Sequence, residues 1–216
     1  MECIESPHNR TFKHLLRLSI DNHYRRKNGL LIVEGKKEID SALAHGYPIE
    51  LLCFDQKYLN NNEQKNYAYI PSITLHHQLF CKLVYRENSS SIIGIFKEPD
   101  LSLTNINLSP QPLIVIIEGI EKPGNVGAIL RSCDAVKADA VIVSGKNHSF
   151  FHPNTIRSSV GTLFSMQLAA GDEEEILQWC KLHHIKIYSA ALQTNTQYTQ
   201  VDYTGGTAFV MGAEDK

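Results

Sequence analysis

The chain has 216 residues, of which 43% are hydrophobic and 20% are charged, and this is typical of a folded protein with one large or two small domains. Its formal net charge of -2 argues against a protein that coats nucleic acid with its whole surface, but it leaves room for a local basic patch. No run approaches the roughly 18 apolar residues of a membrane span, and the first residues lack the apolar core of a signal peptide. We therefore expect a cytoplasmic protein without a membrane segment.

The first hundred residues alternate between helical and strand patterns. Apolar residues recur at spacings of three and four across 11–27, which predicts a helix, and the apolar run 30–33 predicts a strand. The further predicted elements are a helix at 35–45, a strand at 49–54, a polar loop at 60–66, a short segment at 67–70, a helix around 75–85 and a strand at 91–96. This alternation predicts one small α/β domain over residues 1–97.

A basic segment lies near the start of this domain. Asp21 is the only acid among six basic residues, which are Arg10, Lys13, Arg17, Arg25, Arg26 and Lys27. Such an excess of positive charge is suited to contacts with nucleic-acid phosphates. The alternative is a solvated helix face.

Residues 98–112 carry three prolines and little periodicity, which predicts a linker. After it the alternation restarts, and it predicts a mostly parallel sheet with helices on both faces over residues 113–216. The predicted elements are strands at 113–117, 140–143, 185–190 and 207–211, helices at 124–136 and 173–184, and an irregular stretch at 144–165.

Ligands of such a sheet bind beyond the carboxyl ends of its strands. Three segments occupy positions of this kind: EGIEKPGN (118–125), SAALQTNTQ (189–197) and GAEDK (212–216). Gly124 and Gly127 form only G-x-x-G, and no G-x-x-x-x-G-K-[ST] occurs, so a dinucleotide or NTP fold is disfavoured.

The segment 116–136 joins a strand to a helix through a turn at Pro123 and Gly124. The turn leaves unpaired N–H groups at the start of the helix, and such a corner is suited to a ligand or an anion. On a helical wheel Arg131 lies roughly opposite the apolar arc, so its side chain is not packing material. The arc consists of Val126, Ile129, Leu130, Cys133 and Val136.

Two further polar clusters have competing interpretations. Arg157 stands beside Ser158 and Ser159, and an arginine with hydroxyls at a helix end can bind a phosphate. Asp172 precedes three glutamates, which suggests paired carboxylates for catalysis. We favour a helix cap for Asp172, because the helix dipole stabilises acids in the first turn.

No metal site or disulfide is expected. His148 and His152 are spaced by four, but no third ligand lies nearby and Pro153 interrupts any helix. The cysteines are far apart, with no C-x-x-C pair and an odd count, so neither a disulfide framework nor a zinc knuckle is suggested. They are Cys3, Cys53, Cys81, Cys133 and Cys180.

Taken together, GIEKPGNVGAILRSCDAV, HPNTIRSSVGTLF and AFVMGAEDK resemble the SpoU/TrmH branch of the SPOUT superfamily, which are RNA 2′-O-ribose methyltransferases that use S-adenosylmethionine. Upstream, SPHNRTFKHLLRL and RRKNGLLIVEGKKEIDSAL resemble the substrate-binding domain of these enzymes. The resemblance implies a small ribosomal-protein-like α/β domain over 1–97 that binds the RNA substrate, the linker 98–112, and a SPOUT-type methyltransferase domain over 113–216. It also implies a homodimer.

Matched position by position, the family's first-motif asparagine and arginine are Asn125 and Arg131, and its second-motif glycine and glutamate are Gly212 and Glu214. The resemblance implies that Gly212 lies against the cofactor, that Arg131 acts on the ribose hydroxyl, and that Asn125 and Glu214 orient the site. Leu192, in the loop AALQ, is a further expected cofactor contact. The expected RNA contacts are Arg157, Ser159, Arg10, Lys13, Arg25, Arg26 and Lys27.

The family pattern continues beyond GAEDKG to a third motif and a final helix that complete a trefoil knot, whereas this sequence stops at Lys216. The expected function is S-adenosylmethionine-dependent 2′-O-methylation of a ribose in ribosomal or transfer RNA. Because the knot region is missing, the alternative is a truncated, catalytically inactive RNA-binding protein of the same fold. A metabolic enzyme with a nucleotide-binding sheet is a more distant rival.

Overall fold

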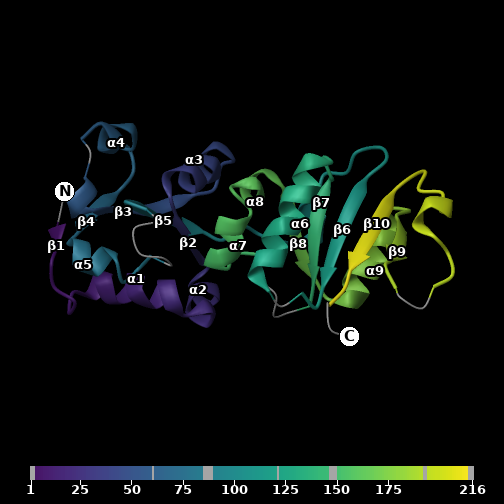
Figure 1. The fold of residues 1–216 in the computed structure, drawn as a ribbon, viewed down its shortest axis with the longest axis horizontal. Coiled ribbons are helices and arrows are strands. Elements are labelled where there is room, and N and C mark those ends of the chain that lie inside the picture. The colour runs from purple at the N-terminus through teal and green to yellow at the C-terminus, as the bar shows by residue number, and fades with distance from the viewer. Residues whose placement is uncertain are drawn as a thin grey trace. The chain divides into compact units, whose positions relative to one another are not determined.

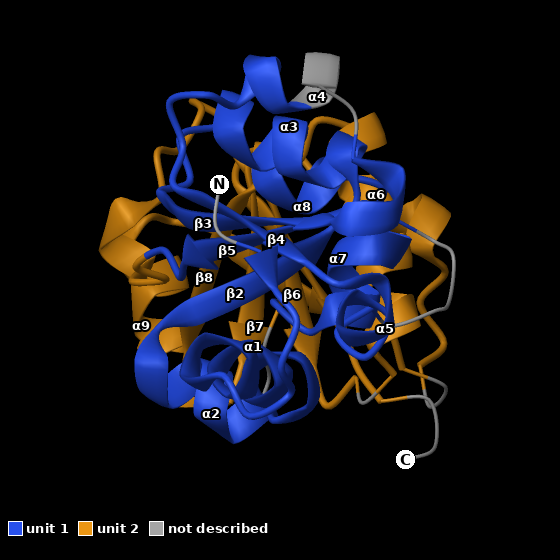
Figure 2. Cartoon of the chain, turned by 90° about the vertical axis from the view of Figure 1, so that its left-hand side faces the viewer, with its two compact units in different colours: residues 1–99, 151–164 blue, residues 100–150, 165–216 orange. Residues whose placement is uncertain are grey.

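The structure is a computed structural model, which describes residues 3–59, 61–84, 90–120, 122–145, 150–191 and 194–213, with only the backbone for 61–63. The chain forms two compact units (Figure 2). Unit 1 comprises residues 1–99 and 151–164, and unit 2 comprises residues 100–150 and 165–216. Each unit contains one five-stranded sheet. No helix in the described part of the chain is long and apolar enough to cross a membrane.

The sheet of unit 1 has the strand order β1-β4-β3-β5-β2. Its strands are β1 (Cys3–Ile4), β2 (Leu30–Glu34), β3 (Ile49–Asp55), β4 (Ser72–Leu75) and β5 (Ile92–Lys97). Strands β1, β4 and β3 are parallel, and β5 runs antiparallel to both β3 and β2. The strands β1 to β4 therefore all end at the same edge of the sheet.

Helices cover both faces of this sheet, with α1 and α2 on one side and α3 on the other (Figure 1). The helical segments of unit 1 are α1 (Arg10–Ile20), α2 (Asn22–Asn28), α3 (Lys36–Ala44), η1 (Gln56–Tyr58), α4 (Asn61–Asn66), α5 (His77–Phe80), α7 (Pro153–Ser158) and the start of α8 (Thr162–Ser165). The segment 60–66, predicted to be a polar loop, thus includes α4. The predicted helix around 75–85 is shorter, because Leu75 belongs to β4.

The single helix predicted over 11–27 is two helices. Asp21 ends α1, and its side chain accepts a hydrogen bond from the Tyr24 N–H at 2.9 Å and so caps α2. An aspartate at this position satisfies helix-start N–H groups, which favours a new helix axis over continuation. Ile20, the last residue of α1, lies at the corner and is 74% exposed, although its spacing fits the apolar pattern predicted over 11–27.

Arg25 is buried at this corner, with only 4% of its surface exposed. Its guanidinium donates to the Leu18 carbonyl at 2.6 Å and to the Ser19 carbonyl at 3.2 Å, both in the last turn of α1. Those carbonyls have no partner within the helix, so Arg25 caps α1 and attaches α2 to it. The expectation that Arg25 contacts RNA is therefore wrong, because its donors face the protein interior.

Residues 151–164 belong to unit 1, although the sequence assigns them to the methyltransferase domain. The rings of Phe151 and Phe164 pack edge-on against Tyr47, with centroid distances of 6.5 and 5.0 Å. The Ser41 hydroxyl donates to the Gly161 carbonyl at 3.0 Å. These contacts join α7 and α8 to the α3 side of unit 1. The contacting residues are far apart in the sequence, so local periodicity does not predict that they meet.

Unit 2 has a fully parallel sheet with the order β8-β7-β6-β10-β9. Its strands are β6 (Leu113–Glu118), β7 (Ala140–Ser144), β8 (Gln167–Gly171), β9 (Lys186–Ser189) and β10 (Thr207–Met211). Figure 2 shows α6 (Pro123–Ala135) and α9 (Glu173–Leu182) on opposite sides of it. The predicted fold class, a mostly parallel sheet with helices on both faces, is confirmed. Strand β8 was not predicted, because its small residues Ala169, Ala170 and Gly171 carry little strand signal.

The segment 98–112, predicted to be a linker, is packed on unit 2. Leu103, Ile106 and Leu108 lie against the core on the α9 side of the sheet, and 103–105 form the short helix η2 (Leu103–Asn105). Asp139 holds the end of the segment, because its carboxylate accepts the N–H groups of Ser109 at 2.7 Å and Leu113 at 2.8 Å. The prolines correctly predicted an irregular backbone for 98–112, but they did not indicate that this segment packs on unit 2.

The burial of Arg25 yields a stability prediction. Replacing Arg25 with Ala leaves two carbonyls at the end of α1 without their donor, so the free energy of unfolding should fall by about 2–4 kcal/mol. Lys27→Ala is the control, since Lys27 is an exposed cation on the same helix, and it should cost less than about 0.5 kcal/mol. Urea unfolding followed by circular dichroism measures both, and equal midpoints would contradict the capping role of Arg25.

Asp139 yields a pH prediction. Burial raises the pKa of Asp139, but the N–H donors of Leu113 and Ser109 outweigh this effect and hold the pKa below its ordinary value of 3.8. Because the folded-state pKa is the lower one, this stabilisation is complete above the unfolded-state pKa and is lost as pH falls through the folded-state pKa.

Asp139→Asn should therefore lower the unfolding free energy by about 1–3 kcal/mol at neutral pH. The difference in unfolding free energy between wild type and variant should disappear as pH falls below about 4. Thermal melting across this pH range measures this difference. A difference that stays constant down to the lowest pH would show that the carboxylate charge is not involved.

Candidate functional site

The order of strands in unit 2 places three loops at one edge of the sheet. From β6 the chain moves outward to β7 and β8, then crosses to the other side of β6, where β10 lies between β6 and β9. This reversal makes the carboxyl ends of β6 and β10 a topological switch point, where open α/β sheets bind ligands. The three segments singled out in the sequence follow β6, β9 and β10, so they leave neighbouring strands at the same edge.

The loops after β6 and β10 approach each other closely. Gly119 has a φ of +65°, and a Cβ on it would lie 3.3 Å from the Cβ of Ala213. Only glycine adopts this conformation without strain. Gly212, beside Ala213, is exposed, and a Cβ on it would meet no atom of the described residues within 4 Å. Its contact with a cofactor stays a prediction.

The helix α6 begins one residue earlier than predicted. Pro123 is its first residue and Lys122 its N-cap, so Asn125 lies in the first helical turn and is half-buried. The Pro-Gly pair therefore starts the helix instead of forming a turn before it, which agrees with the preference of proline for the first helical position. Val136, assigned to the apolar arc, is 63% exposed because the helix ends at Ala135.

Arg131 is exposed on α6, which confirms that it is not packing material. It follows Asn125 by six residues, which corresponds to about 9 Å along the helix axis and to a different side of the helix. One copy of the chain therefore does not present Arg131 and Asn125 on a common helix face.

A small cavity of about 190 Å³ lies between the sheet and the start of α9. Its polar lining comes from Glu118, Ser144 and Ser189 at strand ends and from Glu173 in the first turn of α9. Its apolar lining consists of Ile116, Ile176, Leu177, Ile187 and Val210. Glu118 and Ser189 lie in the ligand segments 118–125 and 189–197 that the sequence indicated, and Glu173 is one of the three glutamates after Asp172. Ser144, which directly follows the predicted strand 140–143, was not singled out from the sequence.

A larger cavity of about 720 Å³ adjoins the first, and both are lined by Ile187 and Ser189. Its volume is within the range of small-molecule sites. Much of its lining comes from the predicted ligand segment: Ser189, Ala190, Ala191, Thr194, Thr196 and Gln197. Aromatic residues form another part, where the Tyr203 ring packs against Tyr188 and Phe209 at 5.0 and 5.2 Å.

The acids at the start of α9 form a helix cap, as favoured from the sequence. The Asp172 carboxylate accepts the Glu175 N–H, and the Glu175 carboxylate accepts the Asp172 N–H, both at 2.9 Å. This reciprocal capping box accounts for the pair without a catalytic role. Glu173 remains available to the small cavity.

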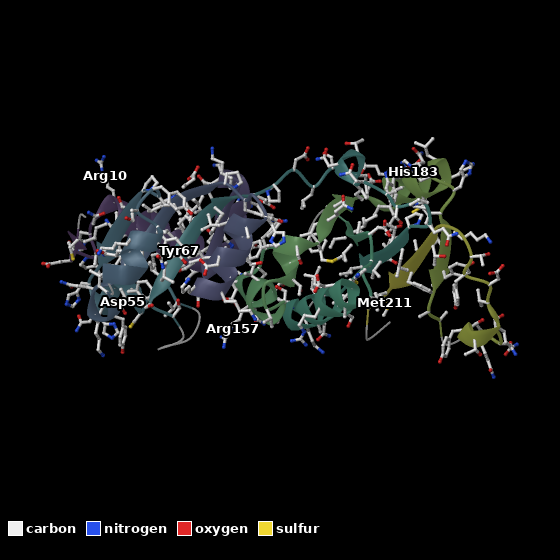
Figure 3. The ribbon with its side chains drawn as sticks, turned by 90° about the horizontal axis from the view of Figure 1, so that it is seen from above. Arg10, Asp55, Tyr67, Arg157, His183 and Met211 are labelled. Carbon is white, nitrogen blue, oxygen red and sulfur yellow. The ribbon has the colours of Figure 1, made fainter. Side chains whose placement is uncertain are left out.

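The remaining predicted RNA contacts differ in exposure. Arg10, Lys13, Arg26 and Lys27 are exposed, and Arg157 is half-exposed in α7. In Figure 3 Arg10 and Arg157 lie on opposite sides of unit 1, so they do not form one patch.

Ser159 cannot contact RNA. It is fully buried, and its hydroxyl donates to the Ile156 carbonyl at 2.6 Å. The prediction for Ser159 is therefore wrong, because the last turn of α7 uses this hydroxyl internally. The sequence alone does not reveal that Ser159 is buried while Arg157, two residues earlier, is half-exposed.

Glu214, Leu192 and His148 lie outside the described residues. His152 caps α7, because its Nδ1 accepts the Asn154 N–H at 3.1 Å. Burial, aided by the charge of Arg25, lowers the pKa of His152 and so favours the neutral ring that can accept this bond. Among the described residues, no group of three His, Cys, Asp or Glu side chains is arranged to hold a metal ion.

Comparison with known proteins decides the family. Residues 112–216 match the SpoU rRNA Methylase family, and residues 9–94 match the MRM3-like substrate binding domain. A solved RNA 2′-O ribose methyltransferase is 32% identical, with a TM-score of 0.81, and the match covers 99% of this chain and 83% of that one. The chain belongs to the SpoU rRNA methylase family.

Other SpoU relatives match over similar lengths. The 23S rRNA (guanosine(2553)-2′-O)-methyltransferase RlmP of Bacillus subtilis is 24% identical over 99% of this chain and 83% of its own. The SpoU methyltransferase AviRb of Streptomyces viridochromogenes, solved in complex with the cofactor AdoMet, is 25% identical with a TM-score of 0.89. That match covers 96% of this chain and 82% of AviRb.

The two glycines at the edge of the SpoU sheet yield a paired prediction. Gly119→Ala should destabilise the protein by about 1–2 kcal/mol, because alanine strains the positive φ and its Cβ approaches Ala213. Gly212→Ala should cost less than about 0.5 kcal/mol, since the added methyl group meets open space. Thermal melting compares the two variants, and equal losses would contradict the close approach of the two loops.

Proposed function

We propose that the protein transfers a methyl group from S-adenosylmethionine to the 2′-hydroxyl of a ribose in RNA. The observation that carries this proposal is the switch point between β6 and β10 in a SpoU-family sheet, where the loops after β6, β9 and β10 leave neighbouring strands at the edge that holds two adjoining cavities. The named relative acts on 23S rRNA, which favours ribosomal over transfer RNA as the substrate.

The residues at this edge fit S-adenosylmethionine chemically. This cofactor is cationic at its sulfonium and its ammonium group, and carboxylates are suited to neighbour such charges. Glu118 and Glu173 supply carboxylates, and Ser144 and Ser189 supply hydroxyls. Gly212 leaves open space in front of the β10 loop. We propose that Gly212, together with the loops that carry Leu192 and Glu214, holds the cofactor, which supplies an electrophilic methyl group when bound.

Arg131 is proposed to act on the ribose. A 2′-hydroxyl is a weak nucleophile, so the site must hold it in line and stabilise the negative charge that develops on its oxygen. A guanidinium has a pKa above about 12 and keeps its proton, so Arg131 serves as a donor and a positive charge, not as a general base. Asn125, in the first turn of α6, is proposed to orient the same site.

The separation of Arg131 from Asn125 along α6 supports the homodimer that the family resemblance implies. Because the two residues lie on different sides of the helix, Arg131 is free to serve the site of a second copy while Asn125 serves its own. A reducing compartment such as the cytoplasm suits the five free thiols of the chain.

Unit 1 is proposed to bind the RNA. Its match to a substrate-binding domain and the exposed cations of α1 and α2 support this role. Arg10, Lys13, Arg26 and Lys27 are suited to the phosphate backbone, which positions RNA without selecting a sequence. Arg157 is a further candidate on α7.

Methyl transfer from labelled S-adenosylmethionine to ribosomal RNA tests the proposal. Arg131→Ala should lower the single-turnover rate by at least about a hundredfold, the scale of losing one preorganised donor, with little change in stability. Lys181→Ala, an exposed cation on α9, is the control and should keep the wild-type rate.

Near-normal turnover by Arg131→Ala would remove this residue from the mechanism. A wild-type protein that binds RNA but neither binds S-adenosylmethionine nor transfers its methyl group would support the alternative of a non-catalytic RNA-binding protein. Calorimetry with S-adenosylmethionine alone separates cofactor binding from the chemical step.

A further inference from the structure

A buried carboxylate joins two segments at the edge of the unit 1 sheet. Asp55, the last residue of β3, is only 2% exposed. One of its oxygens accepts the Lys57 N–H at 2.9 Å, and the other lies 2.7 Å from Nδ1 of His77. Strands β3 and β4 are parallel neighbours with Asp55 opposite Leu75, so η1 and α5 leave the sheet side by side. Asp55 therefore fixes η1 and His77 relative to each other.

The hydrogen bond to Asp55 also sets the chemistry of His77. Because a carboxylate only accepts, the Nδ1 of His77 carries the proton, and its Nε2 has an acceptor lone pair, with the weakly bonding Cys81 sulfur at 3.7 Å. The His77 side chain is 29% exposed, so a ligand can approach it. Burial of the Asp55 carboxylate is offset by these two hydrogen bonds, and the result is an imidazole held in one orientation.

An exposed aromatic ring and a cation stand beside this imidazole. Tyr58 is 47% exposed, and its ring meets that of His77 nearly edge-to-face, with centroids 5.7 Å apart. The Lys57 ammonium lies 5.1 Å from the centre of the Tyr58 ring. Since the acid in this group is buried and hydrogen-bonded, the accessible charge of the cluster is positive.

We propose that Lys57, Tyr58 and His77 form a binding site for one unpaired nucleotide of the RNA substrate. The base stacks on Tyr58, the ammonium of Lys57 pairs with a phosphate, and Nε2 of His77 forms a hydrogen bond with the base or the ribose. An aromatic ring next to a cation is the combination by which proteins bind single-stranded RNA. The inference rests on the proposed function only in taking RNA as the ligand.

Two other roles for the cluster fit less well. A metal site is disfavoured, since the described residues contain no group of three His, Cys, Asp or Glu side chains arranged to hold an ion. A purely structural role explains Asp55 and His77, but it leaves the exposed Tyr58 ring unused. In Figure 3 Asp55 and Arg10 lie on opposite sides of unit 1, so this site is separate from the basic face of α1.

The site at Lys57, Tyr58 and His77 recognises a different feature of RNA than the exposed cations of α1 and α2. Lysines and arginines on α1 and α2 contact phosphates and bind duplex and single strand alike. Stacking on Tyr58 requires a base that is free of its partner. The cluster should therefore discriminate single-stranded from double-stranded RNA, which charge alone does not.

The test compares the affinity of a short fluorescent oligouridylate with that of a blunt RNA duplex of equal length. Tyr58→Ala should weaken binding of the single strand by about 5- to 100-fold, the loss of one stacked base, and leave duplex binding unchanged. Tyr58→Phe keeps the ring and should bind as wild type. Tyr69→Ala is the matched control, because Tyr69 is 75% exposed in the same unit.

Photo-crosslinking gives a readout that a structural role would not produce. Oligouridylate carrying thiouridine should crosslink to the peptide that contains Tyr58, and Lys57→Gln should reduce the yield. Equal single-strand affinity of Tyr58→Ala and wild type overturns the inference, as does crosslinking confined to α1. If the wild type methylates RNA and Tyr58→Ala binds the single strand with unaltered affinity, only this inference fails. If the wild type binds no RNA at all, the proposed function is overturned as well.

Discussion

The insertion of β10 between β6 and β9 is the constraint on which the catalytic unit depends. Parallel strands place all their carboxyl ends at one edge, and the reversal of strand order at β6 opens that edge to a ligand. Loops that are far apart in sequence therefore meet there, and Gly119 lets the loops after β6 and β10 approach closely. Any chemistry at this edge relies on strand register, since a shifted β10 would separate its loop from that of β6.

Single charged side chains connect the irregular parts of both units. Arg25 joins α1 to α2, Asp139 holds the segment before β6, and Asp55 links η1 to α5. Each forms hydrogen bonds of 2.6–3.4 Å with backbone groups or with a side chain, which offset the cost of removing charge from water. These contacts explain why segments with weak periodicity still have defined positions.

The sequence allowed the parallel sheet, most of its strands and the loops at its edge to be predicted, because strand and helix periods survive in the residue order. The corner at Asp21 was missed, since an N-cap inside an apolar pattern looks like an ordinary helical position. Strand β8 was missed because alanine and glycine favour no strand. Packing of 98–112 and the assignment of 151–164 to unit 1 depend on long-range contacts, which local patterns do not record.

Charge alone assigned one RNA contact wrongly, whereas the roles given to the motif residues stay predictions. Arg25 and Arg26 are adjacent and carry the same charge, yet one is 4% exposed and caps α1 while the other is exposed. What distinguishes a structural cation from one that can reach a phosphate is whether its side chain points from the helix into the protein or into solvent. Tyr58 and His77 are the opposite case, because no count of charges identifies them, yet the buried Asp55 carboxylate holds His77 beside Tyr58 at the protein surface. The proposed recognition of RNA therefore depends less on the number of cations than on which polar groups the fold leaves facing solvent.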